Sequence, residues 1–114
     1  MNTLDKIKNK KSDNIVDKLI FEKGLKIKTI FIVSDLDLMI IVLNNKKILN
    51  IQLTDYPKLK NANKNQLNNW KLISGGIGIE WEDLDEDLSL KGFIETYAYQ
   101  TAIQSINQNE YLFT

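Results

Sequence analysis

Three consecutive runs of apolar and β-branched residues constrain the fold of this chain more than any other feature. The first run, Leu25 to Val33, alternates with the two-residue period of a β-strand, and Leu36 to Leu43 and Ile48 to Leu53 follow as similar runs. Asp35 marks the first turn, and the polar segment 44–47 makes the second connection. The pattern predicts a meander of three antiparallel strands whose apolar face must be covered by helices.

Strict alternation divides the first run into two faces. One face is expected to carry Leu25, Ile27, Thr29, Phe31 and Val33, and the other Lys26, Lys28, Ile30 and Ile32.

Helical patterns flank the predicted meander on both sides. An N-terminal helix is predicted to begin after Ser12 or Asp13 and to end at Gly24, where glycine suits the left-handed residue that closes a helix. A C-terminal helix is predicted from Leu90 to about Ile106, with Ser89 as its cap. The apolar residues of the first helix follow helical spacing, and they are Ile15, Val16, Leu19 and Ile20.

The middle of the chain begins with a break in the strand pattern at Tyr56-Pro57, because proline cannot donate a ladder hydrogen bond. A helix is predicted from Asn61 or Asn63, with Leu67 and Trp70 one turn apart on a single face. A glycine-rich turn between two short extended pieces is predicted next, and its glycines are Gly75, Gly76 and Gly78.

Length and composition limit the domain organisation and the chemistry. We interpret residues 1–11 as a flexible polar leader and 12–114 as one α+β domain, since 114 residues with 43% hydrophobic content support one core. The predicted architecture is two-layer, with a sheet of three to four antiparallel strands packed with helices. The absence of cysteine and histidine excludes disulfides, thiolate chemistry and Ser-His or Cys-His triads. The longest apolar run, Leu38 to Leu43, is too short to span a bilayer, so a cytoplasmic protein without membrane association is expected.

Charge is distributed unevenly along the chain, although the formal net charge is +0. Residues 1–71 contain 14 lysines and 7 acidic residues, which gives +7, whereas residues 72–114 contain 1 lysine and 8 acidic residues, which gives −7. Two faces of opposite sign, suited to a polar partner, or mutual cancellation in the folded chain are both consistent with this asymmetry.

A specific resemblance rests on a set of motifs in the second half of the chain. The motifs are Leu53-Thr54-Asp55-Tyr56-Pro57-Lys58-Leu59, then Ala62, Leu67, Asn69-Trp70, Gly75-Gly76-Ile77-Gly78-Ile79, Trp81 and Leu84-Asp85-Glu86-Asp87-Leu88-Ser89. This combination resembles the bacterial DUF2442 family, whose function is not established, over about residues 25–95. The resemblance implies an antiparallel sheet covered by helices. It also implies that some relatives carry a separate DNA-binding domain and that others lie beside small partner proteins, as in toxin–antitoxin loci.

The densest chemistry is an acidic segment at residues 80–87, with six carboxylates in eight residues. Its candidate partner-binding residues are Glu80, Trp81, Glu82, Asp83, Asp85, Glu86 and Asp87. Three interpretations are open: backbone and helix capping, an acidic contact surface for a basic protein, or a Ca²⁺ or Mg²⁺ site. The EF-hand pattern fails at Leu88 and Ile94, where the loop needs glycine and glutamate, so no metal or cofactor is assigned.

Other candidate sites have structural alternatives. The glycines lack the lysine and hydroxyl of a phosphate-binding loop, and the two tryptophans fit a core better than a stacking platform. The leader offers a candidate nucleic-acid site, because lysines can contact the phosphate backbone, and its lysines are Lys6, Lys8, Lys10 and Lys11.

The sequence therefore predicts a non-enzymatic protein-interaction or regulatory module, in a setting such as a bacterial defence, toxin–antitoxin-like or phage-related locus. The acidic segment and the terminal helices are its expected contact surfaces, with a basic protein as partner and a homo-oligomer as an open alternative. The alternative function is a nucleic-acid-binding regulator that uses the lysine-rich N-terminal half.

Overall fold

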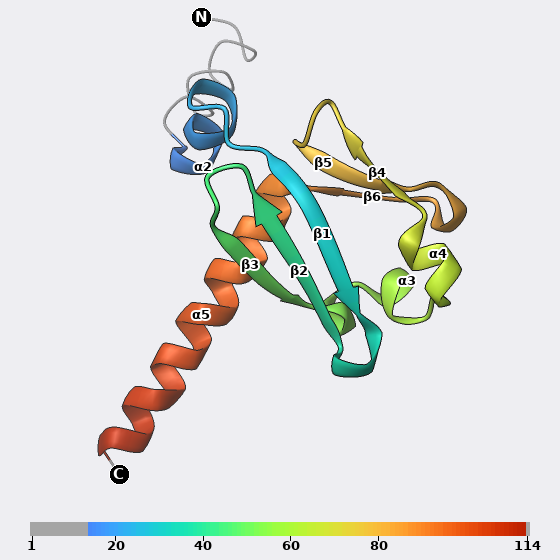
Figure 1. Ribbon diagram of the computed structural model, residues 1–114. Helices are drawn as coiled ribbons and strands as arrows, with labels where there is room; N and C mark the ends of the chain where they lie inside the picture. The colour runs from blue at the N-terminus through green and yellow to red at the C-terminus, as the bar shows by residue number, and fades with distance from the viewer. Residues whose placement is uncertain (1–13, 114) are drawn as a thin grey trace, which may run out of the picture.

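The computed structural model describes residues 14–113 of the chain, with side chains up to residue 106. In chain order the helices and strands are α2 (Ile15–Asp17), β1 (Ile27–Val33), β2 (Leu38–Leu43), β3 (Ile48–Gln52), α3 (Pro57–Lys60), α4 (Lys64–Asn68), β4 (Trp70–Ile73), β5 (Gly78–Trp81), β6 (Glu86–Ser89) and α5 (Leu90–Phe113). The strands form two antiparallel sheets, β1-β2-β3 and β4-β5-β6, which we call sheet A and sheet B (Figure 1). The predicted α+β class is confirmed.

Sheet A is the predicted meander, but the faces of β1 depart from strict alternation. The pairing of β1 with β2 shifts between Ile27 and Thr29, where Lys28 is the extra residue of a β-bulge. The bulge brings Ile27 to the same side as Ile30, and both side chains are buried. The predicted grouping of Ile27 with Phe31 is therefore wrong, because one inserted residue reverses the alternation.

The predicted N-terminal helix is present as α2 followed by a π-helical turn, Lys18–Glu22. Its cap is Asn14, whose side-chain oxygen accepts hydrogen bonds from two backbone N–H groups of the first turn, at 2.9 and 3.1 Å. The predicted caps, Ser12 and Asp13, lie outside the described residues. Gly24 ends the segment in a left-handed conformation, with φ of 75°, as expected.

Two short helices follow β3. Pro57 occupies the first turn of α3, where its missing N–H is not needed. Asn63 caps α4 in a reciprocal capping box with Gln66. The predicted helical pairing of Leu67 with Trp70 is wrong: α4 ends at Asn68, and Trp70 begins β4.

Sheet B contains the predicted glycine turn and one strand that the sequence analysis missed. The turn 74–77 joins β4 to β5, and β6 then pairs along β5. The missed strand β6 is Glu86–Ser89, a short sequence with two acidic residues among its four and with low strand propensity. The structure thus adds a second sheet to the predicted meander.

The C-terminal helix α5 begins where predicted and continues to Phe113. Ser89 caps it, since the Ser89 hydroxyl accepts a hydrogen bond from the Gly92 N–H at 3.0 Å. The helix passes behind sheet A in Figure 1 and packs along β3. Near its N-terminal end, Lys91 forms an ion pair with the buried carboxylate of Asp17 at 3.1 Å, which ties α5 to α2.

One apolar cluster joins both sheets and the helices. It includes Met39, Ile41 and Ile51 from sheet A, Ile79 and Trp81 from sheet B, Leu59 and Leu67 from the short helices, and Leu90 and Phe93 from α5. Phe93 also meets the ring of Tyr56 edge-on, with centroids 5.7 Å apart. The inner face of sheet A is thereby covered, whereas its other face lies outside this core.

Candidate functional site

The acidic segment 80–87 forms the hairpin between β5 and β6. Glu80 of β5 lies directly opposite Asp87 of β6 on one side and Lys71 of β4 on the other. These three side chains therefore share one face of sheet B. The Lys71 ammonium lies 3.7 Å from the Glu80 carboxylate and 3.8 Å from that of Glu82. Part of the acidic charge is thus neutralised within the sheet.

Trp81 does not belong to an exposed contact surface. Its exposed fraction is 0%, and its indole N–H donates to the Leu67 carbonyl at 3.0 Å. The prediction that Trp81 contacts a partner is therefore wrong. Alternation along β5 turns the Trp81 side chain into the core, while Glu80 points away from the core.

Two further carboxylates of the segment, those of Asp83 and Glu82, have different surroundings. The Asp83 carboxylate accepts a hydrogen bond from the Asn69 amide at 2.9 Å, and the Glu82 side chain is 76% exposed. Within the part of the chain that is described, no group of three or more Asp, Glu, His or Cys is arranged to hold a metal ion. This arrangement suits turn stabilisation and an external contact better than chemistry that needs converging carboxylates.

The hairpin turn of the acidic segment has a counterpart in sheet A. Both turns contain the sequence Asp-Leu-Asp, at 35–37 and 83–85, within a single 3₁₀ turn and its closing residue. The second aspartate is left-handed in each case, with φ of 55° at Asp37 and 49° at Asp85. Aspartate tolerates this conformation, because its short polar side chain can hydrogen-bond locally. The likeness covers too few residues to register as a repeat in the sequence.

Helix α3 connects the two Asp-Leu-Asp turns. Lys60 donates to the Asp37 carboxylate at 3.0 Å, and Lys58 donates to the Asp85 backbone carbonyl at 2.9 Å. The hydrogen bond from Lys60, aided by one from Thr54, holds the pKa of the Asp37 carboxyl below its ordinary value of 3.8, against partial desolvation. These contacts give the Asp-Leu-Asp turns a structural role in aligning the two sheets.

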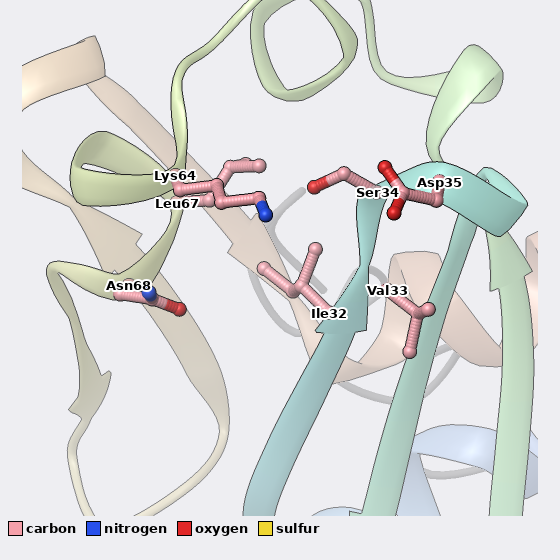
Figure 2. A pocket seen from close by; sticks show the side chains of 7 residues that line it. All are labelled: Ile32, Val33, Ser34, Asp35, Lys64, Leu67 and Asn68. Carbon is pink, nitrogen blue, oxygen red and sulfur yellow. The ribbon is translucent and has the colours of Figure 1, made fainter.

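A small pocket lies beside the first Asp-Leu-Asp turn, between the end of β1 and α4. Its volume is ≈ 250 Å³, and it is lined by Ile32, Val33, Ser34, Asp35, Lys64, Leu67 and Asn68. Figure 2 shows the Lys64 ammonium and the Ser34 hydroxyl pointing toward one another across it. The volume falls below the range of about 300–1,000 Å³ that is usual for ligand pockets. The pocket is therefore a weaker candidate for a binding site than the sheet surface described next.

A larger feature is the face of sheet A that points away from the core, which we call the outer sheet face. Its nine residues are Thr29, Phe31 and Val33 of β1, Leu38, Ile40 and Val42 of β2, and Ile48, Asn50 and Gln52 of β3. Six of these nine paired residues are apolar and none is charged, while the unpaired bulge residue Lys28 is exposed at the end of the same side. Phe31 is 58% exposed and Ile48 is 53% exposed. In Figure 1 this face is turned toward the viewer, and none of the described helices covers it.

The outer sheet face was not predicted from the sequence, because helices were expected to cover the apolar side of the meander. A signal was present in the three runs. Strands buried on one side only should alternate apolar with polar residues, whereas Leu38 to Leu43 is apolar at every position. Such a run indicates a strand whose two faces are both suited to contact.

The terminal helices, also expected to form contacts, expose a few apolar side chains. Ile15 and Leu19 are exposed in the N-terminal helical segment, whereas Ile20, which belongs to the same predicted helical pattern, is buried. On α5, Tyr99 and Ile103 are exposed one helical turn apart. The lysines proposed for nucleic-acid contact, Lys6, Lys8, Lys10 and Lys11, lie outside the described residues.

The fold and these surfaces define a small α+β domain built from two antiparallel sheets and a long C-terminal helix. Within residues 14–113, no helix has the length and apolar character needed to cross a membrane. The model of a family described as protein of unknown function (DUF2442) matches residues 28–98. The chain therefore belongs to the DUF2442 family.

Two solved structures share this fold. One is the crystal structure of a protein of unknown function from Rhodospirillum rubrum, with 25% identity, a TM-score of 0.56, and coverage of 63% of this chain and 87% of that one. The other is the solution structure of an uncharacterized protein from Chromobacterium violaceum, with 21% identity, a TM-score of 0.61, and coverage of 85% and 84%. A comparison with curated proteins gave no match.

Proposed function

We propose that this protein is a non-enzymatic protein-interaction module whose contact surface is the outer sheet face. The observation that carries the proposal is the group of six apolar side chains on one face of sheet A, of which three are exposed and three are half-buried. Contiguous apolar patches of several hundred Å² are uncommon on monomeric proteins and mark interaction sites.

The size of the outer sheet face supports this proposal. Its strands are 7, 6 and 5 residues long. Three such strands cover roughly 14 by 20 Å, or about 280 Å² in projection. This projected area is close to the lower end of the range of about 300–600 Å² for the largest apolar patches of monomeric proteins, which are often functional.

The acidic segment is a second candidate contact surface, supported by the high exposure of Glu82. The two candidates differ in their response to salt. An acidic surface that binds a basic partner weakens as salt screens the charges, whereas apolar burial does not. Salt dependence therefore separates the two candidates.

The test is affinity capture from native cell lysate with the full chain as bait, at low and high salt. Three variants accompany the wild type: Phe31→Lys on the outer sheet face, Phe21→Lys as a matched control, and Glu82→Gln/Asp83→Asn/Glu86→Gln in the acidic segment. Phe21 is 66% exposed in the π-helical turn, outside the outer sheet face.

We expect a specific protein, including other copies of the chain itself, to be retained at high salt and lost only with Phe31→Lys. If the captured protein is lost at high salt and with the acidic-segment variant, but not with Phe31→Lys, the contact surface is the acidic segment and not the outer sheet face. Recovery that is sensitive to nuclease would instead favour the nucleic-acid alternative.

A further inference from the structure

We infer that the partner of the outer sheet face is the same face of a second copy of this chain, with the strands of the two copies running antiparallel. The inference rests on the proposed function, since both need the outer sheet face as a contact surface. It adds the identity of the partner and the geometry of the complex.

The composition of the face permits self-association. The nine paired residues of the face carry no charge, so two copies can bring these residues together without repulsion or loss of ion hydration. Flat sheet faces pack on one another about 10 Å apart, with strand directions offset by roughly 30°. Contact between identical faces closes a two-fold dimer, which is the commonest symmetry of soluble oligomers.

Charges at the two ends of sheet A select the orientation. Lys46 and Lys47, in the connection between β2 and β3, and Lys28, at the bulge, are exposed at one end of the sheet. The opposite end carries the Asp-Leu-Asp turn, in which Asp37 is paired with Lys60 and Asp35 lines a pocket together with Lys64, so it has no comparable excess of positive charge.

Only two simple stackings of the face on itself need to be compared. Stacking with parallel strands would place the lysine ends of the two copies together, six like charges in all, which is unfavourable. Antiparallel stacking places each lysine end over the end of the partner that carries Asp35. The distribution of charge thus favours the antiparallel dimer.

The antiparallel geometry makes a residue-level prediction. A two-fold axis in the interface, perpendicular to the strands, places each strand over its own copy in the reverse direction. Ile40, in the middle of the central strand, then lies near its counterpart, and Ile48 at one end of β3 lies over Gln52 at the other end of the partner's β3. In the parallel stacking, β3 would lie over β1 instead.

The first experiment is sedimentation velocity of the full chain at about 1–500 µM, a range chosen for an interface of the smallest specific size. A dimer of twice the 13.2 kDa chain mass is expected to form as the concentration rises. Phe31→Lys should raise the dimer Kd at least about 100-fold, since the substitution enters the interface twice. Phe21→Lys should leave the Kd unchanged.

A second variant guards against misfolding of the first. Phe31→Ser removes the apolar contact without adding charge and should also weaken the dimer. Its circular dichroism spectrum should match that of the wild type, which shows that the variant is folded. A wild-type chain that stays monomeric over the whole range would overturn the inference. So would a dimer that neither Phe31 variant weakens while both remain folded.

The orientation is tested by cross-linking, because the chain contains no cysteine and single cysteines can be introduced. An equimolar mixture of Ile48→Cys and Gln52→Cys chains is treated with a short bis-maleimide. Cross-links between positions 48 and 52, absent when Phe31→Lys is added to both chains, support the antiparallel dimer. Failure to form them under conditions where the chain is dimeric would overturn it.

The outcomes also separate this inference from the proposed function. A monomeric chain whose lysate partner is a different protein, lost with Phe31→Lys, would overturn the dimer and leave the interaction module standing. A monomeric chain that captures no partner through this face would overturn both.

Discussion

Replacement of Gly76 by alanine should destabilise this protein far more than the same replacement at the adjacent Gly75. Gly76 lies in the turn between β4 and β5, and its carbonyl accepts a hydrogen bond from the Ile27 N–H at 2.8 Å. A Cβ atom on Gly76 would lie 2.4 Å from the Ile27 carbonyl oxygen and 2.9 Å from the Ile27 nitrogen. This turn therefore joins sheet B to the start of β1 through an approach that only glycine permits.

The magnitude follows from two contributions. The φ of Gly76 is 126°, a conformation that costs a residue with a side chain about 1–3 kcal/mol. Relief of the clash requires the backbone of β1 to move away, and loss of the Ile27 hydrogen bond costs about 1–3 kcal/mol more. The sum of about 2–6 kcal/mol is a large part of the roughly 5–15 kcal/mol by which domains of this size are stable.

Gly75 provides the matched control. Its φ is also positive, at 77°, but a Cβ atom there would meet no atom within 4 Å. Gly75→Ala should therefore lower the free energy of unfolding by only about 1–2 kcal/mol, which is the cost of holding alanine in the left-handed backbone conformation. The difference between the two variants isolates the contact between the sheets.

The assay is equilibrium urea unfolding of the wild type and both variants, followed by tryptophan fluorescence, since Trp81 is fully buried in the native state. Equal free energies of unfolding for Gly75→Ala and Gly76→Ala, within about 0.5 kcal/mol, would refute the close approach of Gly76 to β1.

Three further outcomes are expected. Trp81→Phe should lower the free energy of unfolding by about 1–3 kcal/mol in urea titrations, because the buried Leu67 carbonyl loses its donor. Ser89→Ala should cost about 1 kcal/mol of thermal stability through loss of the α5 cap, and Ser89→Asp should preserve it. Asp37→Asn should destabilise the protein at pH 7, and this difference should shrink as the pH falls below 3.8, because a lowered pKa stabilises the fold only while the carboxyl is ionised. A constant difference between Asp37→Asn and wild type across pH 2–7 would contradict the stabilising role of the ionised carboxyl.

Local patterns predicted the elements whose stability is decided by their own residues. The meander follows from three runs with strand propensity, and the start of α5 follows from the cap at Ser89, because both signals act within a few residues. The glycine turn was likewise readable, since positive φ angles at Gly75 and Gly76 require glycine there.

Elements that depend on neighbours could not be read in the same way. Strand β6 has few strand-forming residues and exists because β5 supplies its hydrogen-bond partners. Trp70 shows the opposite error: its spacing from Leu67 fits a helix, yet the chain turns after Asn68 so that Trp70 can pair with Trp81 across sheet B. Pairing across a sheet outweighed local periodicity at both places.

The sequence by itself determined the composition of two features, the acidic hairpin at 80–87 and the apolar meander. It also excluded thiol, imidazole and catalytic-triad chemistry, because the chain has no cysteine and no histidine. Tertiary structure alone decided which side chains reach solvent. The bulge at Lys28 selects the buried face of β1, the alternation of β5 hides Trp81, and the single packed core leaves the outer sheet face open. The physical reason is that a residue's type sets the free energy of its burial, whereas the packing of distant segments determines whether burial occurs.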